Sequence, residues 1–390
     1  MMTHDEYLAT RRFPALDGVR AVAAVLVIVF HHGGPGWVRA NGWIGVHLFF
    51  VLSGYLITTL ALREEARTGR VSLPEFYLRR AFRILPVYYV VMGVVVVFAY
   101  FREMGLRASG IVDTLPWNVI FLGEYYHMPL FGQSWTLGVE QKFYVVWPLL
   151  AFGLGALGFV KRLSLSVGLV AVMLALIPFM QYAGAYSPIL IGCTLAIVLH
   201  HRKGFAALRV FTHPVAGLAV AVTLVAVQIG FVDIAAFLHD DGGSITGTGY
   251  VLLVALLVPS LVAGAGPVAW ILSRRPMRFV GARSYSLYLV DGVIATGLAG
   301  AIPQFASHRT LTAVAVTVAG LLAADLLHRW VEVPMIDVGR RVIARRRATK
   351  AGPAGETAGS VEAAGLLLLG ETVEAAAVPV SAPASAQPAG

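Results

Sequence analysis

Cysteine and charged residues are both scarce in this 390-residue sequence. The single cysteine, Cys193, excludes a disulfide framework and a cysteine-ligated zinc site, and it gives no reason to invoke a thiol nucleophile. Charged residues make up only 13% of the chain and hydrophobic residues 58%, with a mean hydropathy of +0.76. This balance excludes an ordinary soluble domain and indicates a polytopic membrane protein.

Only short polar stretches separate the apolar segments from one another. The apolar segments have about the length that a helix needs to cross a bilayer, roughly 17 to 24 residues. We therefore predict an all-α integral membrane protein, a bundle of about ten transmembrane helices. The expected spans are 14–32, 43–62, 84–102, 135–158, 163–182, 184–201, 212–232, 248–265, 284–303 and 310–331.

The prevailing sign of charge alternates between successive connections of these spans. Segments 63–83, 200–211 and 266–283 are rich in arginine and lysine, whereas 103–134 is mainly acidic and 232–247 has no basic residue. By the positive-inside rule, the basic connections and both termini are expected in the cytoplasm. The net charge of +9 then needs no nucleic-acid partner, because the excess lies beside the anionic inner leaflet of the plasma membrane.

The two ends of the chain need separate treatment. Arg11 and Arg12 precede an apolar run, as in a signal peptide, but the following HHGGPG offers no small-residue cleavage site, so we expect the first helix to be retained. A transmembrane domain is expected over residues 1–345. Residues 346–390 are dominated, beyond a short basic start, by alanine, glycine, proline, serine and glutamate, and they are expected to form a disordered cytoplasmic tail.

Polar residues enter the first apolar segment in a regular pattern. Arg20 and His31 are eleven residues apart, which on a helix is about 20° past three full turns and about 16 Å along the axis. They share one face, while His32 is turned roughly 100° further. This face is predicted to be a polar track across the membrane. The alternative is that Arg20 reaches the lipid headgroups and the histidines cap the outer end of the helix.

Ionisable residues recur at five further apolar segments, where they are costly and usually mark a functional site. Two other features carry less weight. The GLGALG at 153–158 lacks the strand–helix unit of a dinucleotide site, and Ser53 is assigned to close helix packing without a catalytic role. The recurring ionisable residues are His47, Arg79, Arg80, Arg83, Glu140, Asp291 and Glu332.

The order of these residues resembles acyltransferase family 3, membrane-bound O-acyltransferases that modify surface glycans, lipids and some antibiotics. The likeness covers about 11–340. The sequence departs from the family at His47, where an acidic residue is usual, and at Asp291, where a histidine commonly stands. The motifs that carry the likeness are R-x10-H (Arg20, His31), GVHLFFVLSGYLI from Gly45, RRAFRILP from Arg79, WTLGVEQKFY from Trp135 and SYSLYL from Ser284.

The resemblance implies roles for individual residues. His31 would be the general base that takes the acceptor's proton, and Glu140 would orient its imidazole. The alternative for Glu140 is a structural pair with Lys142 or an arginine. Glu332 is expected to pair with one of the arginines as a structural ion pair. Candidate ligands for the phosphates of acyl-coenzyme A are Arg20, Arg79, Arg80 and Arg83, with positive-inside topology as their alternative explanation.

We therefore expect an O-acyltransferase of the plasma membrane that uses acyl-coenzyme A, most commonly the acetyl form, as co-substrate. The acceptor hydroxyl would belong to a glycan, a glycolipid or a macrolide-like molecule, and no resident cofactor or metal is expected. His47 and Asp291 are further candidate site residues. Two alternatives stay open: a transporter whose charged residues line a permeation route, and a catalytically lapsed relative that only binds a glycan or lipid.

Overall fold

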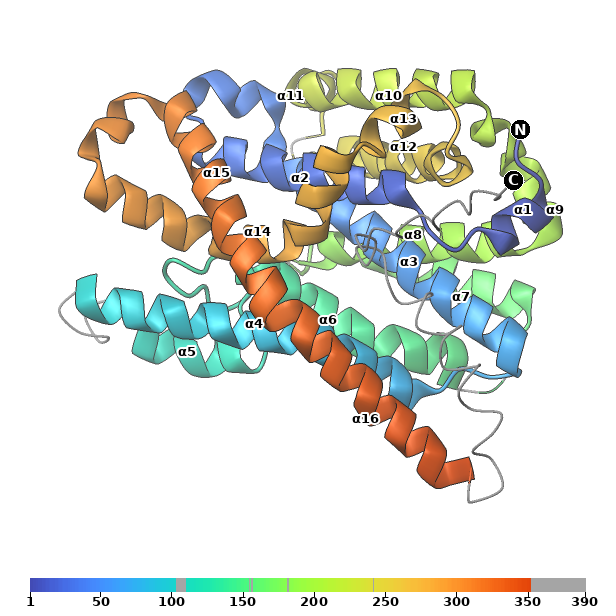
Figure 1. Ribbon diagram of the computed structural model, residues 1–390. Helices are drawn as coiled ribbons and strands as arrows, with labels where there is room; N and C mark the ends of the chain where they lie inside the picture. Colours follow the sequence, from blue (N-terminus) through green and yellow to red (C-terminus); the bar gives the residue numbers. More distant parts are fainter. Residues whose placement is uncertain (103–109, 154, 156, 181, 241, 352–390) are drawn as a thin grey trace, which may run out of the picture.

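The computed structural model describes residues 1–102, 110–153, 155, 157–180, 182–240 and 242–351, and within them the regular structure is entirely helical. Figure 1 shows the helices as one bundle. The α-helices are α1 (His4–Ala9), α2 (Pro14–His32), α3 (Gly45–Thr68), α4 (Leu73–Arg102), α5 (Ile111–Val119), α6 (Ser134–Pro148), α7 (Phe159–Ala175), α8 (Ala183–His200), α9 (Arg202–Leu208), α10 (Pro214–Ile229), α11 (Phe231–Phe237), α12 (Ser244–Ala263), α13 (Pro267–Leu272), α14 (Arg275–Ala301), α15 (Arg309–Leu327) and α16 (Val333–Ala351).

The count of about ten membrane spans is not confirmed. Among the described residues, six helices are long and apolar enough to cross a membrane, and a seventh span is possible if the bent pair 202–212 and 214–229 counts as one. Four expected spans are not among the six. Three of them correspond to shorter helices, because α6 has 15 residues, α7 has 17 and α10 has 16. The fourth, 284–303, lies in α14, which has 27 residues but is not among the candidates. The six candidates are Pro14–His32, Gly42–Thr68, Leu73–Arg102, Ala183–His200, Ser244–Ala263 and Arg309–Thr349.

Glycines allow the central helices to approach one another closely. A Cβ added to Gly54 of α3 would lie 1.9 Å from the carbonyl oxygen of Ile189, and one added to Gly192 of α8 would lie 2.2 Å from that of Val51. Both distances are shorter than any side chain can occupy. Small residues at helix interfaces are the usual means of packing helices tightly inside a membrane, so α3 and α8 form a fixed pair at the centre of the bundle.

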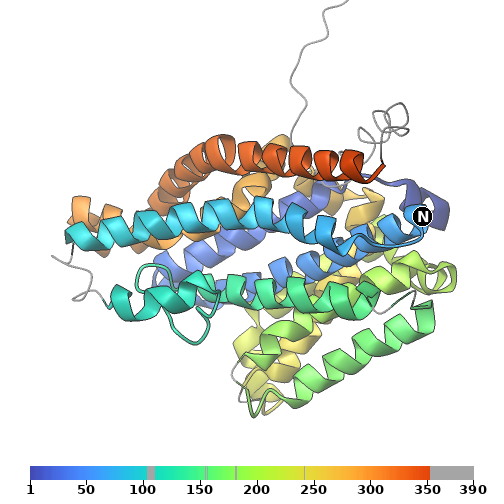
Figure 2. The same ribbon diagram turned by 90° about the horizontal axis from the view of Figure 1, so that it is seen from below.

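Contacts at one end of the bundle bring together several basic segments. Arg63, at the end of α3, donates to the carbonyl oxygens of Thr10 and Tyr7 at 2.6 and 3.1 Å, and a ring nitrogen of His4 lies 3.0 Å from the carbonyl oxygen of His200. Arg347 near the end of α16 forms an ion pair with Glu75 of α4; Figure 2 shows these two long helices side by side. We call this the basic end.

The opposite end carries the last residues of α2, so we call it the His31 end. There, the indole nitrogen of Trp37 donates to the hydroxyl of Thr310 at the start of α15 at 3.0 Å, and Arg102 at the end of α4 reaches the carbonyl oxygen of Thr296 at 3.4 Å. The N-terminus and the first basic connection thus lie at one end, as expected. Which side of a membrane each end faces stays a prediction.

The C-terminal part of the chain is helical for longer than the sequence indicates. A π-helical turn, His328–Glu332, joins α15 to α16, and α16 continues to Ala351. The first six residues of the expected tail, 346–351, are therefore helical. The remaining tail residues, 352–390, lie outside the described residues.

Candidate active site

A cavity runs along the inside of the bundle between α2, α3, α4, α6 and α14. It extends from Arg11 and Leu60 at the basic end to Val46, Thr136 and Tyr288 towards the His31 end. We call it the arginine cavity. Its charged and polar lining residues are Arg11, Arg20, Ser53, Arg80, Arg83, Thr136, Glu140, Tyr144, Ser284, Tyr285 and Tyr288.

Three of the four predicted donor-site arginines lie together in this lining. Arg20 enters from α2, and Arg80 and Arg83 enter from α4. The guanidinium of Arg80 lies 5.8 Å from the centre of the Tyr144 ring. Within the part of the chain that the structure describes, none of these three arginines lies within 4.0 Å of a carboxylate. These three cations, with Arg11 as a fourth in the same lining, share the cavity without a direct ion pair among the described residues, which suits a multiply charged anion.

The fourth arginine, Arg79, is not part of the cavity lining. Its guanidinium lies 2.7 Å from a carboxylate oxygen of Glu64 and 3.6 Å from one of Glu75. Helix rotation sets Arg79 about 100° from Arg80 but only about 40° from Arg83. The ion pair with Glu64, and not the spacing, therefore holds Arg79 at the α3–α4 turn, while Arg80 and Arg83 line the cavity.

Glu140 lies in the arginine cavity and has a different partner from the one expected. Its Oε1 accepts a hydrogen bond from Ser53 Oγ at 2.7 Å. The alternative partner Lys142 instead forms an ion pair with the buried Glu124 and donates to the carbonyl oxygen of Phe121 at 2.8 Å. Glu140 therefore belongs to the same site as the arginines, and the expectation that it orients His31 is not what the structure shows.

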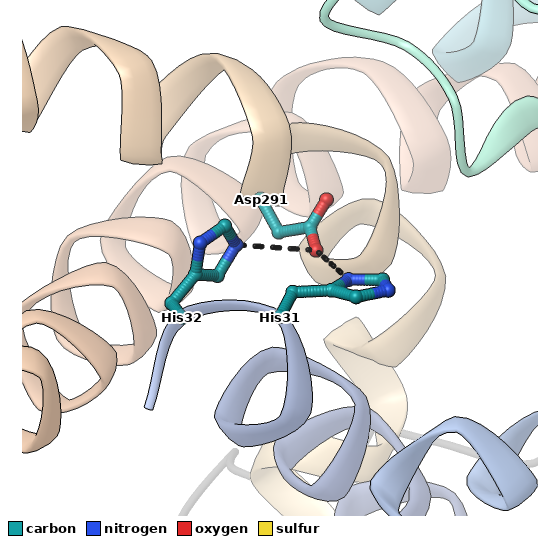
Figure 3. Close-up of side chains that lie close together, drawn as sticks. All are labelled: His31, His32 and Asp291. Atoms are coloured by element: carbon teal, nitrogen blue, oxygen red, sulfur yellow. Dashed lines mark ion pairs between the residues drawn. The ribbon is translucent and has the colours of Figure 1, made fainter. Parts of the chain in front are cut away.

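The carboxylate next to His31 is that of Asp291, from the middle of α14. Its Oδ2 lies 3.6 Å from His31 Nδ1 and 3.8 Å from His32 Nε2. Figure 3 shows the two imidazoles on either side of this oxygen, with His31 Nε2 directed away from it. The Asp291 side chain is 3% exposed and that of His31 is 44% exposed. The arrangement leaves His31 Nε2 available to a molecule arriving from the His31 end.

Two other candidates lie outside the arginine cavity. The ring of His47 packs edge-on to Trp43, with centroids 5.8 Å apart, and its Nδ1 is buried without a hydrogen-bond partner. Among the described residues, Glu332 does not pair with an arginine. Its carboxylate lies 3.0 Å from Nδ1 of His328, which is also buried within the same π-helical turn. The expected arginine partner was therefore wrong.

Sequence reasoning missed several members of the cavity, among them Ser53, Tyr144 and Tyr288. Ser53 was assigned to packing alone, yet it lines the cavity and binds Glu140. Tyr144 stands four residues after Glu140, a spacing that places both on one helix face and could have identified it. Tyr288 lies in the SYSLYL motif, and its hydroxyl lies 3.3 Å from that of Thr136. No sequence signal pairs these last two residues.

Comparisons with known proteins identify the family of the chain. Residues 13–329 match an acyltransferase domain family, Acyl_transf_3. A peptidoglycan O-acetyltransferase OatA from Listeria monocytogenes is 28% identical over 354 residues, which cover 83% of this chain and 55% of that protein. A putative peptidoglycan O-acetyltransferase YrhL from Bacillus subtilis is 29% identical over 370 residues, covering 86% and 57%.

An O-acetyltransferase OatA from Staphylococcus aureus is 26% identical over 374 residues, covering 87% of this chain and 60% of that protein. The chain thus spans between a half and two thirds of the length of these relatives. No solved structure matches it.

Proposed function

The chain belongs to acyltransferase family 3, and we propose that it moves an acetyl group from acetyl-coenzyme A to a hydroxyl of a cell-wall glycan of the peptidoglycan type. The acceptor is proposed from the relatives, two of which are named as peptidoglycan O-acetyltransferases. The observation that supports the donor is the group of three arginines without ion pairs in one cavity. Coenzyme A carries several phosphates, which forked guanidinium groups bind well.

The arginine cavity has the direction that such a donor needs. The arginines in its lining lie towards the basic end, and Tyr288 on α14 lines it towards the His31 end. Asp291 is three residues beyond Tyr288, so the cavity reaches to within about one helical turn of the carboxylate beside His31. A donor held by its phosphates can extend its flexible arm along the cavity and present the thioester near His31.

His31 is proposed to act as the general base. We propose that the Asp291 carboxylate, 3.6 Å from Nδ1, favours the neutral tautomer with its proton on Nδ1, which leaves Nε2 as the proton acceptor. The acceptor oxygen bonds to the acyl carbon, the carbon–sulfur bond breaks, and the proton taken by His31 passes to the departing thiolate. The products are an O-acetyl ester and free coenzyme A.

We propose that Glu140 organises the donor site and does not orient the general base His31. Its carboxylate is the one acidic group in the lining of the arginine cavity, and it holds Ser53 by a hydrogen bond. A single carboxylate among several arginines offsets part of the electrostatic repulsion between their guanidinium groups. His47 remains a candidate for contacts with the acceptor, since its buried Nδ1 has no partner.

The experiment is a transfer assay with the purified protein in proteoliposomes. Acetyl-coenzyme A and a soluble peptidoglycan fragment are supplied, free thiol is measured, and the glycan is analysed by mass spectrometry. We expect thiol release that depends on the acceptor and a mass gain of one acetyl group, both lost in His31→Ala. Thiol release without an acetylated glycan would reject the acceptor. Failure of both with intact protein would reject the enzyme and favour a transporter or a binding protein.

A further inference from the structure

His31, His32 and Asp291 present three potential metal ligands to one point. The ligand atoms are His31 Nδ1, His32 Nε2 and a carboxylate oxygen of Asp291, and all three lie within 4.8 Å of one another (Figure 3). The two nitrogen–oxygen distances, 3.6 and 3.8 Å, are longer than a hydrogen bond. The imidazoles therefore converge on the carboxylate without completing a hydrogen bond to it.

These distances are close to those between ligands of one ion. Nitrogen and oxygen ligands lie about 2.0 to 2.2 Å from Zn²⁺, which in a tetrahedral site separates neighbouring ligands by about 3.3 to 3.5 Å. The observed separations from Asp291 Oδ2 exceed this by a few tenths of an ångström. Small rotations of the two histidine side chains would close that difference.

The surroundings of the cluster also favour a cation. Asp291 is 3% exposed, and among the described residues its ion pairs are only those with His31 and His32. His32 Nε2 is buried and has no hydrogen-bond partner. A buried carboxylate whose two histidine partners lie beyond hydrogen-bond distance, and a buried nitrogen without a hydrogen bond, are both costly. A bound divalent ion would satisfy both groups at once.

We propose that His31, His32 and Asp291 form a binding site for a divalent transition metal of the zinc type at the His31 end. Imidazole and carboxylate are suitable ligands for such ions, and three protein ligands leave one coordination position open. The half-exposed side of His31 gives the ion a path from solution. The sequence predicted no metal here because the three ligands come from two helices far apart in the chain.

Metal binding has a consequence for transfer that rests on the proposed role of His31. When Nδ1 of a neutral imidazole binds a metal, the ring proton is on Nε2. Nε2 is then a donor and cannot accept the proton of the acceptor hydroxyl. Zinc bound at this site is therefore an inhibitor, and removal of His32 should relieve the inhibition while His31 and Asp291 stay in place.

The test begins with binding, which does not depend on transfer. The full-length protein in detergent is treated with a chelator and then titrated with Zn²⁺ against a chromophoric chelator. Co²⁺ is added separately to record its visible absorption bands. We expect one equivalent to bind, and His32→Gln and Asp291→Asn to weaken binding by at least about 10- to 100-fold and to remove the Co²⁺ bands. His308→Gln changes an exposed histidine at the same end and serves as the matched control.

Transfer is measured next, with and without Zn²⁺. We expect zinc to inhibit the wild type and His308→Gln, and His32→Gln to keep its transfer activity in the presence of zinc. If one equivalent of Zn²⁺ binds and neither His32→Gln nor Asp291→Asn weakens the binding, the proposed site is wrong. Site-specific binding without inhibition would overturn the inhibitory role. If no form of the protein transfers acetyl groups, the proposed function fails, while the zinc titration still decides the metal site.

Discussion

Tyr288 and Asp291 lie three residues apart on α14, so about one helical turn separates the wall of the arginine cavity from the carboxylate next to His31. The two halves of the proposed reaction meet at this turn. The cavity on one side of Tyr288 holds the cationic groups, and Asp291 on the other side lies beside the base.

The arginines that line the cavity should determine donor affinity. We expect Arg80→Ala and Arg83→Ala each to raise the Michaelis constant for acetyl-coenzyme A by about 10- to 100-fold, the worth of a charge-assisted hydrogen bond. Arg20→Lys should recover only part of the Arg20→Ala loss, because an ammonium lacks the forked geometry. Arg79→Ala is the control, since Arg79 pairs with Glu64 outside the cavity. An equal rise of the donor's Michaelis constant in Arg79→Ala would indicate that all four arginines serve membrane topology and do not bind the donor.

The two adjacent histidines should differ in their importance for transfer. His31→Ala is expected to lower kcat by about 10² to 10⁴, the contribution of a general base, while the protein stays folded in the membrane. His32→Ala should be much milder, because His32 is not proposed to contact the acceptor. Single-turnover rates at saturating donor, measured without added zinc, check this difference. Comparable losses in both variants would be incompatible with a unique base at His31.

Asp291 should act on kcat through His31. We expect Asp291→Asn to lower kcat by at least about 10²-fold, since an amide does not hold the imidazole in the same tautomer. The Michaelis constant for the donor should stay unchanged, because Asp291 lies outside the arginine cavity. Partial recovery of kcat in Asp291→Glu would show that the carboxylate positions His31, because general structural damage would not be repaired by a second carboxylate. A rise in the donor's Michaelis constant alone would assign Asp291 to donor binding instead.

Ser53 and Glu140 should behave as one unit. Ser53→Ala removes a hydrogen bond to the Glu140 carboxylate inside the cavity. Glu140→Gln removes the negative charge of the group that accepts this bond. Residues in one hydrogen-bonded network typically show a coupling energy of about 0.5 to 3 kcal/mol. A double-mutant cycle on kcat/KM for the donor measures this energy. Additive effects would mean that the two residues act separately.

The donor and the acceptor should be used from opposite sides of the membrane. The arginines lie towards the basic end, and His31 lies about 16 Å further along α2. Inside-out vesicles loaded with acceptor should therefore react with added acetyl-coenzyme A. Sealed right-side-out vesicles without internal donor should not. Equal activity in right-side-out vesicles supplied with donor only from outside would reverse the assignment of the two ends.

Some properties of this protein follow from helix periodicity and composition alone. The apolar segments determine that the chain is a helical membrane protein, and the eleven-residue spacing places Arg20 and His31 on one face of α2. The three-residue spacing of Arg80 and Arg83 likewise places them about 60° apart on one side of α4. These relations hold within a single helix, where the rotation per residue is fixed.

Other properties depend on which helix faces meet, and only the tertiary structure decides them. His31 meets Asp291 instead of Glu140 because the end of α2 packs against α14, whereas α6 turns Glu140 towards Ser53 of α3. The first of these contacts is allowed by Gly281 of α14, where an added Cβ would lie 1.9 Å from the carbonyl oxygen of Asp17 in α2. Residues far apart in the sequence leave no periodic signal of their contact, because the relative position of two helices is set by the side chains packed between them.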